Sequence, residues 1–433
     1  MNTTSKSILS ATGVVASVAA VIMGYRARQQ ADIGAVQVAD NGVTIDRMVA
    51  SRSNDINVPA GDYFYELSQK LKDQYVEPVT DDNKLVTGAI RGMILSLQDP
   101  QSQYLDRTQF ASYLNARDGK FEGIGADFAL VTGPNAAQLE AAHEQEAPAT
   151  TAEDAVVSVQ DIPRLQVVSV VPGGPADKAG VSVGDLVYSV DGHWVAQSEP
   201  IRKFRKALRD FNSKKISAAA INQLRTEIRA KADKAIMPVK AKDMLFLGKS
   251  GAVTVVWERK GVQRSTKITK LHSTMPGFQV SGNEIRLPFV PASANSLKHA
   301  IAGKSEVTID LRNNTMGDLG SMKQCLEVIA PSGEYGNFTT FRHDKPTPLV
   351  VRKGNSNPPR ITLVTDKSTR GAAEIFALAL SSRGVAHLTG SETGGDRDVR
   401  SIFRLTDGSG YTLVTSVYKP TLGKAKRTIG GTR

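Results

Sequence analysis

The strongest constraint on the fold is the regular exchange of strand-like and helical segments that begins near Met275. Short runs rich in aliphatic residues predict strands at 285–290, 307–311, 361–365, 385–389 and 411–417. Helical periodicity lies between them, at 295–302, 319–330 and 371–382. Because strands that alternate with helices pack as layers, the C-terminal part of the chain is predicted to be an α/β domain.

The preceding part of the chain has a different pattern. Residues 62–75 and 85–97 repeat apolar side chains at three- and four-residue spacing, which predicts two helices. Residues 164–195 alternate like strands, with Gly-rich turns between them. A helical and basic segment follows at 201–245, with thirteen Lys and Arg against four Asp and Glu. Residues 132–163, rich in Ala, Glu and Thr, predict an exposed insertion.

Charge and cysteine content limit the functional classes only weakly. The 433 residues hold 54 Lys and Arg against 43 Asp and Glu, a net charge of +11. Such an excess favours lipid head groups, nucleic acid or acidic proteins as partners, or is ordinary solvated surface. Cys325 is the only cysteine, so an intramolecular disulfide is impossible and the redox compartment stays undetermined.

Residues 8–25 form a run without any charge near the N-terminus. A helix of that length at about 1.5 Å per residue spans roughly 27 Å, close to the thickness of a hydrocarbon core. We interpret it as a membrane anchor, with a cleaved signal peptide as the alternative. Lys6 precedes the run, and Arg26 and Arg28 follow it. By the positive-inside rule, the part of the protein after the run would then lie in the cytoplasm.

Several segments, in the same order, resemble the carboxyl-terminal processing (tail-specific) serine proteases of the S41 type. The matching segments are DQYVEPV (73–79), DPQSQYL (99–105), FEGIGADF (121–128), VVSVVPGGPADKAGVSVGDLVYSVDG (167–192), VTIDLRNNTMG (307–317), ITLVTDKSTRGAAEIFALAL (361–380) and LTDGSGYTLVTSVYKPTLG (405–423). The resemblance implies an α/β plus β fold with an N-terminal helical segment, a PDZ domain with insertions and a C-terminal protease-like α/β core of ββα type. It also implies that the bulk of the chain lies outside the cytoplasm, in the periplasm or its equivalent. This expectation is opposite to the location that Arg26 and Arg28 indicate by the positive-inside rule.

Composition and resemblance together predict five parts of the chain. They are an anchor or signal segment at 1–25, a linker at 26–60, a helical region at 61–118, a PDZ-like domain at 119–272 with inserts at 132–163 and 201–245, and an S41-like core at 273–433.

The PDZ resemblance implies a peptide-binding loop at Gly123, Ile124, Gly125 and Ala126. Successive backbone N–H groups in such a loop can hold a peptide carboxylate while the peptide adds as a strand to the sheet edge. The two glycines permit unusual φ angles and a close approach of the backbone. The alternative is a PDZ fold kept for packing or docking alone.

In the family that this chain resembles, cleavage is assigned to a serine nucleophile, a lysine general base and a glutamine that orients the lysine. The nucleophile lies three residues before the glutamate matched here by Glu374, which places Gly371 at its position. An alignment that starts from Ser368 places Arg370 there instead. Neither residue carries the hydroxyl or thiol that a nucleophile requires.

The two other catalytic positions differ from the family as well. The stretch GSETGGD at 390–396 matches the family's G-E-x-T-x-G-K, so Asp396 stands where the lysine belongs. Arg400 stands at the glutamine position, four residues later. Without an amine that can take a proton, a hydroxyl remains a poor nucleophile. The three substitutions together predict that peptidase activity is lost.

The region that would stabilise transition-state charge is also altered. Met316-Gly317 replaces the family's paired glycines after D-L-R-x-N-x. We expect Met316 to crowd or redirect a backbone N–H needed for the oxyanion. Asp310 and Arg312 are retained, and we expect Arg312 to pair with a carboxylate.

A nearby hydroxyl is the alternative nucleophile. Ser368 and Thr369 lie three and two residues before Gly371, which in extended chain means roughly 7–10 Å at about 3.3 Å per residue. A base must come within about 3 Å of the proton it removes. We therefore expect a non-cleaving homologue that binds peptides or serves as an assembly subunit, and keep an S41-type endopeptidase with a non-standard nucleophile as the alternative.

The expected partners follow from the same features. They are protein or peptide C-termini, the membrane through the N-terminal segment, and an active paralogue or larger complex. The basic segment 201–245 would contact anionic lipid or an acidic partner, or is a solvated helix pair. It lacks interleaved aromatic residues, so nucleic acid is not expected. No HExxH or CxxC motif occurs, and no metal or other cofactor is expected.

Overall fold

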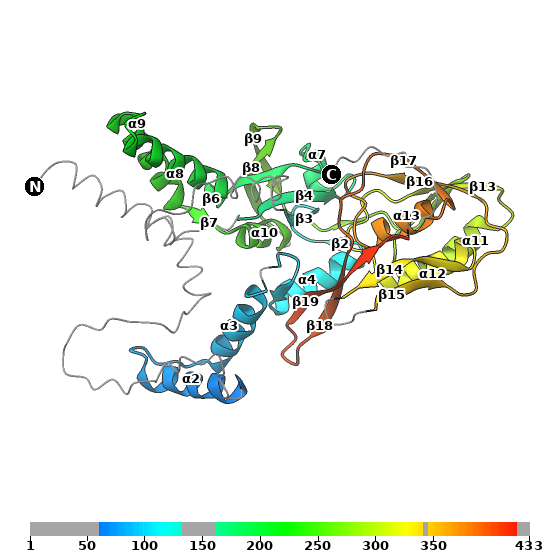
Figure 1. Ribbon diagram of the computed structural model, residues 1–433, viewed down its shortest axis with the longest axis horizontal. Coiled ribbons are helices and arrows are strands. Elements are labelled where there is room, and N and C mark those ends of the chain that lie inside the picture. Colours follow the sequence, from blue (N-terminus) through cyan, green and yellow to red (C-terminus); the bar gives the residue numbers. More distant parts are fainter. Residues whose placement is uncertain (1–59, 98, 132–161, 249, 341–344, 422–433) are drawn as a thin grey trace, which may run out of the picture. The chain divides into compact units, whose positions relative to one another are not determined.

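The computed structural model describes residues 60–97, 99–131, 162–248, 250–340 and 345–421 (Figure 1). The predicted anchor at 1–25, nearly all of the linker at 26–60 and most of the insert at 132–163 lie outside these residues. No helix in the described ranges is long and apolar enough to cross a membrane. The described residues before Asp99 and those from Asp99 onward belong to separate compact units, which are treated one at a time.

The first unit contains the two predicted helices. They are α2 (Ala60–Gln74) and α3 (Asp82–Leu95). Asp81 caps α3 by accepting a hydrogen bond from the Asn83 amide at 3.0 Å, which satisfies one of the unpaired donors of the first turn. Large apolar side chains on both helices, such as Phe64 and Val86, remain exposed.

The second unit begins with a short strand that pairs with the last described strand of the chain. β1 (Gln103–Leu105) pairs with β19 (Gly410–Lys419), and α4 (Arg107–Arg117) follows. A capping box starts α4, because Asp106 accepts from the Gln109 amide while the Gln109 side chain accepts from the Asp106 amide. α4 therefore begins at a fixed point beside the C-terminal strand.

The PDZ domain is a mixed sheet in the order β3–β4–β5–β6–β7, with β8 and β9 attached through β5. Its elements are β3 (Ala126–Val131), β4 (Arg164–Val170), α7 (Pro175–Lys178), β5 (Leu186–Val190), β6 (His193–Val195), β7 (Ala235–Ile236), α10 (Pro238–Phe246), β8 (Ala252–Arg259) and β9 (Val262–Thr269). Its core is made of buried aliphatic side chains around Trp257. β3 forms an edge of the sheet, the type of edge to which a peptide strand can add.

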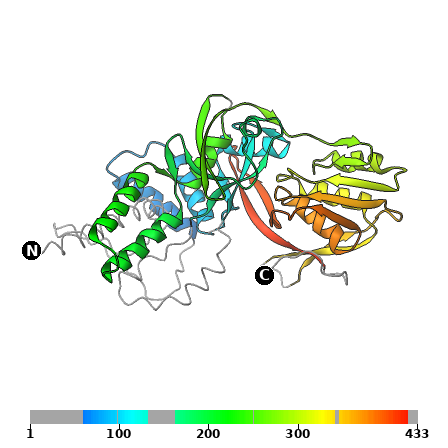
Figure 2. The same ribbon diagram turned by 90° about the horizontal axis from the view of Figure 1, so that it is seen from above.

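The basic segment predicted as one insert at 201–245 has two different parts. α8 (Ser198–Asn212) and α9 (Ala218–Ala232) form a helical hairpin (Figures 1 and 2). α10 instead buries Ala241 and Leu245 in the core that β3, β4 and β5 share. The predicted end of the insert is therefore wrong, since the basic residues around α10 concealed its buried face.

The C-terminal core has three layers, with helices between two sheets (Figure 1). One sheet has the order β11–β12–β13–β16–β17, and the other has the order β1–β19–β14–β15, with β18 paired to β19. The strands are β11 (Gln279–Ser281), β12 (Glu284–Arg286), β13 (Glu306–Asp310), β14 (Gly333–Thr339), β15 (Thr347–Val351), β16 (Arg360–Thr365), β17 (Ala386–Gly390) and β18 (Asp398–Arg404). The helices are α11 (Ser293–Ile301), α12 (Leu319–Ile329) and α13 (Ala372–Ser382).

The predicted α/β alternation is confirmed, with one strand shorter than expected. The run predicted at 285–290 pairs only as Glu284–Arg286. Pro288 follows at once, and proline has no N–H to donate to the ladder. The core is otherwise continuous, from Ile285 and Ile309 in the sheet to Phe376 on α13.

Candidate functional site

Gly371 occupies the turn between β16 and α13, where the predicted nucleophile position lies. Its φ of 56° and ψ of −126° place it in a region that residues with a side chain rarely adopt. A Cβ atom built on it would lie 3.7 Å from the Arg400 guanidinium and 3.8 Å from the Thr315 carbonyl, which are ordinary contacts. The position thus has room for a side chain directed at Arg400, and carries none.

The same geometry decides between the two possible registers. The Arg370 side chain donates to the Gly394 carbonyl at 2.9 Å, and its guanidinium lies on the Asp396 carboxylate. Its amide donates to the Asn314 carbonyl at 3.0 Å. Of these two neighbours, Gly371 is the one that faces Arg400, the residue at the predicted glutamine position. This geometry favours the register that predicts Gly371 at the nucleophile position.

Asp396 lies beside Gly371 and is held by two arginines. Its carbonyl accepts from the Gly371 amide at 2.9 Å. Its carboxylate is 2.5 Å from the Arg400 guanidinium and 3.7 Å from that of Arg370. Asp396 is 6% exposed, and its Oδ1 atom has no hydrogen-bond partner among the described residues. The predicted base position therefore holds an anion in an ion pair.

Glu374, in the first turn of α13, completes this cluster. It is buried and accepts a hydrogen bond from the Asp396 amide at 2.8 Å. Burial raises the pKa of Glu374, while the bonds from Asp396 and Thr393 and the charge of Arg370 act against that rise. Its role is to hold the loop that carries Asp396.

Ser368 and Thr369, the alternative nucleophiles, lie in a turn and not in the extended chain that we expected. Ser368 is fully buried, donates to Asp366 and accepts from the Asn313 amide at 2.6 Å. Thr369 donates to the Leu311 carbonyl at 3.2 Å. Both hydroxyls thus connect the turn to the end of β13. Within the described residues, no Ser or Thr hydroxyl is hydrogen-bonded to a lysine amine.

Two PDZ residues that the sequence analysis did not single out lie near Arg400. They are Asp127 on β3 and Lys242 on α10. Burial lowers the pKa of Lys242, and the charge of Arg400 lowers it further, against Asp127 and Asp243. Burial also lowers the pKa of Arg400, but the charges of Asp396, Tyr113 and Asp127 outweigh this effect and leave it raised.

Tyr113 of α4 belongs to the same group. Burial raises its pKa, and the charges of Arg400 and Arg117 act against the rise. Nothing in the local sequence marks these residues as neighbours of Arg400. The sequence signal that could have pointed to Lys242 is its place in a helix that also carries Ala241 and Leu245, which are buried.

The predicted PDZ loop is engaged by its own domain. The Gly123 amide donates to the Gly248 carbonyl at 2.9 Å, and the Ile124 amide donates to the Leu245 carbonyl at 3.1 Å. Ile124, Gly125 and Ala126 are buried. In this conformation two of the loop amides are therefore engaged, by Leu245 in the last turn of α10 and by Gly248 beyond it, and do not face an open carboxylate site.

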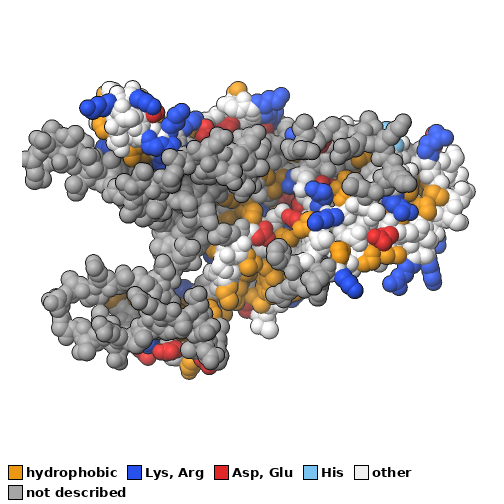
Figure 3. Space-filling model, viewed as in Figure 1, with side chains coloured by type: hydrophobic (Ala, Val, Ile, Leu, Met, Phe, Trp, Pro, Cys, Tyr) orange, Lys and Arg blue, Asp and Glu red, His pale blue; other side chains and the backbone are white. Residues whose placement is uncertain are grey.

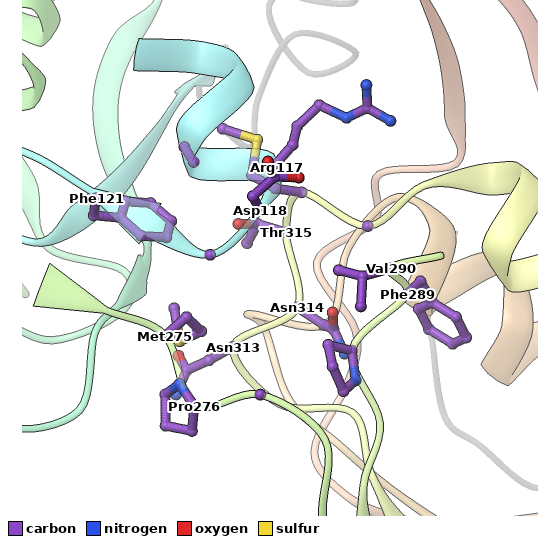
Figure 4. A pocket seen from close by; sticks show the side chains of 16 residues that line it. Arg117, Asp118, Phe121, Met275, Pro276, Phe289, Val290, Asn313, Asn314 and Thr315 are labelled. Carbon is purple, nitrogen blue, oxygen red and sulfur yellow. The ribbon is translucent and has the colours of Figure 1, made fainter. Parts of the chain in front are cut away.

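Met316 and Gly317 line an apolar pocket of about 130 Å³ (Figure 4). Phe121 and Met275 lie on one side of it, and Val290 and Phe289 on the other. Met316 packs against a cluster that includes Phe121 and Phe246. The volume is close to that of an engineered apolar cavity of about 150 Å³ that holds benzene. The pocket therefore suits one apolar side chain.

This pocket adjoins the position of Gly371. A Cβ atom on Gly317 would lie 3.4 Å from that of Ala372 and 3.0 Å from that of Phe289. Thr315, whose carbonyl faces Gly371, also lines the pocket. Thr315 and the Gly317–Ala372 contact thus link the apolar pocket to Gly371, which faces Arg400.

Two other expectations concern single groups. The expected pairing of Arg312 is confirmed, since its guanidinium donates to Asp310 at 2.9 and 3.0 Å. Among the described residues, no group of three His, Cys, Asp or Glu side chains is arranged to hold a metal ion.

A PDZ domain followed by a three-layer α/β core, with the cleft at the start of α13, defines a PDZ-containing serine-peptidase fold. Comparison with known proteins gives the family. Residues 289–430 match the model of peptidase family S41, residues 166–215 a PDZ domain, and residues 58–109 the N-terminal domain of the activating protease CtpB. The chain thus contains a peptidase family S41 domain, and it is similar to the carboxy-terminal processing proteases.

Relatives in bacteria support this assignment at low identity. The chain is 25% identical over 355 residues to the carboxy-terminal processing protease CtpA of Bacillus subtilis, covering 80% of this chain. It is 25% identical over 368 residues to CtpB of the same organism, covering 82%. The match spans 62% of the length of each. A carboxy-terminal-processing protease of Bartonella bacilliformis is 24% identical over 375 residues, which cover 85% of this chain and 72% of that one.

A solved structure supports the fold alone. The photosystem II D1 C-terminal processing protease matches with a TM-score of 0.51 and 18% identity over 82% of each chain.

Proposed function

We propose that this chain is a non-cleaving member of its family, a pseudoprotease that holds peptide segments in the old substrate cleft. The observation that carries the proposal is Gly371, which has no side chain where a nucleophile would face Arg400. The position predicted for the lysine base holds Asp396, which is paired with Arg400, and the buried Ser368 hydroxyl is bonded to Asp366 and the Asn313 amide instead of to an amine.

Binding would use the parts of the cleft that remain. An apolar peptide side chain would enter the pocket next to Gly317, and the peptide backbone would add to the edge of β3. In that role the chain acts as a scaffold or assembly subunit, alone or with an active relative. Anchoring by residues 8–25, with the bulk of the chain outside the cytoplasm, belongs to the same proposal.

The test of activity uses the purified chain and an unfolded, dye-labelled protein substrate. We expect no cleavage above that of a heat-denatured sample. The rival function is an endopeptidase with a non-standard nucleophile. Cleavage that disappears in Ser368→Ala or Lys242→Ala would establish that rival and end the proposal.

The test of binding fills the pocket. Val290→Trp places a larger side chain in its wall, so we expect weaker binding of the unfolded protein by fluorescence anisotropy. Val350→Trp is the control, because Val350 is exposed on β15 and does not line the pocket. Equal effects of the two variants would remove the pocket from the proposal.

Capture of peptide C-termini by the PDZ loop requires the end of α10 to move. While the Ile124 amide donates to Leu245 of α10 and the Gly123 amide donates to Gly248, two residues beyond α10, neither amide is left for a carboxylate. We therefore expect the same peptide to bind equally well with a free or an amidated C-terminus. A clear preference for the free acid, measured by titration, would mean that the loop opens.

The location is tested separately. Protease added to spheroplasts should digest the chain beyond residue 60, as it digests an exported marker protein. Full protection of that part would place it in the cytoplasm.

A further inference from the structure

The α8–α9 hairpin carries most of the excess charge of the protein. Residues 198–234 hold eleven Lys and Arg against four Asp and Glu, a surplus of seven, whereas the whole chain has a surplus of eleven. About one twelfth of the sequence therefore supplies well over half of the net charge. Neither the pocket nor the Asp396–Arg400 pair uses this surface.

The hairpin separates apolar and cationic side chains on opposite faces. Phe204 of α8 and Ile221 and Ile228 of α9 are buried. Arg202, Lys206 and Arg209, spaced four and three residues apart on α8, are exposed along one face. Lys214 and Lys215 continue this face at the turn, and both are exposed. Figure 3 shows Lys and Arg side chains gathered over the two helices at the upper left.

The composition of this face favours a lipid surface over other anions. None of the described large apolar side chains of residues 198–234 is strongly exposed, although the centre of a protein interface is normally apolar. Exposed aromatic rings, on which single-stranded nucleic acid would stack, are missing from the described residues of the hairpin as well. An anionic membrane needs only exposed Lys and Arg within a Debye length of about 10 Å.

The sequence supplies a reason for the membrane to be close. Residues 8–25 have the length and apolar character to enter a bilayer. A tether raises the effective concentration of a second, weaker contact. We propose that the cationic face of the α8–α9 hairpin docks on anionic lipid head groups. The tether is part of the proposed function, so the experiment scores tether and docking separately.

The experiment uses the full chain with a fluorophore at Asn212→Cys, next to the turn of the hairpin. The native Cys325 is buried and leaves the label specific. The chain is mixed with phosphatidylcholine vesicles, with or without roughly 30 mol% phosphatidylglycerol, that carry a quencher on their head groups. Flotation with both vesicles reports the tether. If the hairpin docks, the fluorophore should be quenched only by the vesicles that contain phosphatidylglycerol, and about 0.5 M salt should reverse the quenching.

Matched variants test which lysines act. Lys206→Gln/Lys214→Asn/Lys215→Gln should lower the docked-to-undocked ratio at least about tenfold. Lys267→Gln/Lys298→Gln/Lys353→Gln removes the same charge from exposed sites elsewhere and should leave it unchanged. Equal quenching on both vesicles, or equal losses in the two variants, would overturn the proposal. Polyglutamate serves as a model of an acidic protein. If it changes the fluorescence while anionic vesicles do not quench it, the proposal is overturned in favour of an acidic protein partner.

Discussion

At the scale of single residues, the three positions predicted for catalysis lie next to one another, and they hold Gly371, Asp396 and Arg400. Gly371 leaves an open space, and Arg400 points toward it while pairing with Asp396. An orphaned oxygen on the buried Asp396 carboxylate is costly, and such groups persist where the surrounding structure fixes them. Gly371, Asp396 and Arg400 therefore form one electrostatic unit. Changing the residue at one of these positions should not restore catalytic function at the other two.

Restoring the hydroxyl alone should not restore cleavage. Gly371→Ser places an oxygen beside Arg400, which is charged and takes no proton. We expect no hydrolysis of an unfolded substrate, and a loss of about 1–3 kcal/mol in unfolding free energy from the positive φ. Gly371→Ala should lose a similar amount, which separates backbone strain from chemistry. Hydrolysis by the serine variant would mean that a base is present.

Glu374 should make stability depend on pH. Burial raises its folded pKa, so its contribution is full below the unfolded value of about 4.3 and is lost as pH rises through the folded pKa. Glu374→Gln removes that loss, because the amide stays neutral. The melting temperature of the variant relative to the wild type should be higher at pH 7 than at pH 4. Glu334→Gln, at an exposed site, should show no such trend, and a trend equal to that of Glu374→Gln would contradict the assignment.

At the scale of secondary-structure elements, α10 connects the PDZ domain to the cleft. Its buried face packs on β3 and β4, its Lys242 lies near Arg400, and its C-terminal end bonds the loop at Gly123. The carbonyls of the last turn of a helix lack intrahelical partners, and the loop amides satisfy one of them here. The closed loop is thus a consequence of how α10 ends.

The closed loop predicts a large effect of one methyl group. In Gly123→Ala, the new Cβ would meet the Leu245 carbonyl at 2.1 Å, so α10 must shift or the loop must open. We expect a loss of more than about 3 kcal/mol in unfolding free energy by denaturant titration. Gly173→Ala has nearly the same φ and no atom within 4 Å, so it should lose only about 1–2 kcal/mol. Equal losses would show that φ strain alone matters.

At the scale of the whole molecule, the C-terminal core should unfold as one body. Cys325 lies fully buried between the sheets, and burial raises its thiol pKa to about 12. Since the thiolate is the reactive form, the native protein should not react with a thiol reagent at pH 8. Reaction should rise together with the loss of far-UV circular dichroism in denaturant. Ser305→Cys, at an exposed site, should react at once in the native state. Fast native labelling of Cys325 would contradict a closed core.

Much of the fold could be predicted because its signals are local. The strands at 361–365 and 411–417 and the helix at 371–382 follow from periodicity within a few residues. The altered positions at Asp396 and Arg400 could be found because short motifs fix their spacing. The end of the insert could not be placed, because whether α10 is surface or core depends on what packs against it.

The sequence by itself determined the order of domains and the α/β alternation, and it predicts the replacement of the serine and the lysine, since each is written in neighbouring residues. Tertiary structure alone decided that Gly371 faces Arg400, that the charge of Arg400 acts on Lys242 and that two amides of the PDZ loop are engaged within the domain. These features depend on the direction of a Cβ atom and on contacts between segments far apart in the chain. Such contacts exist only after the core has packed.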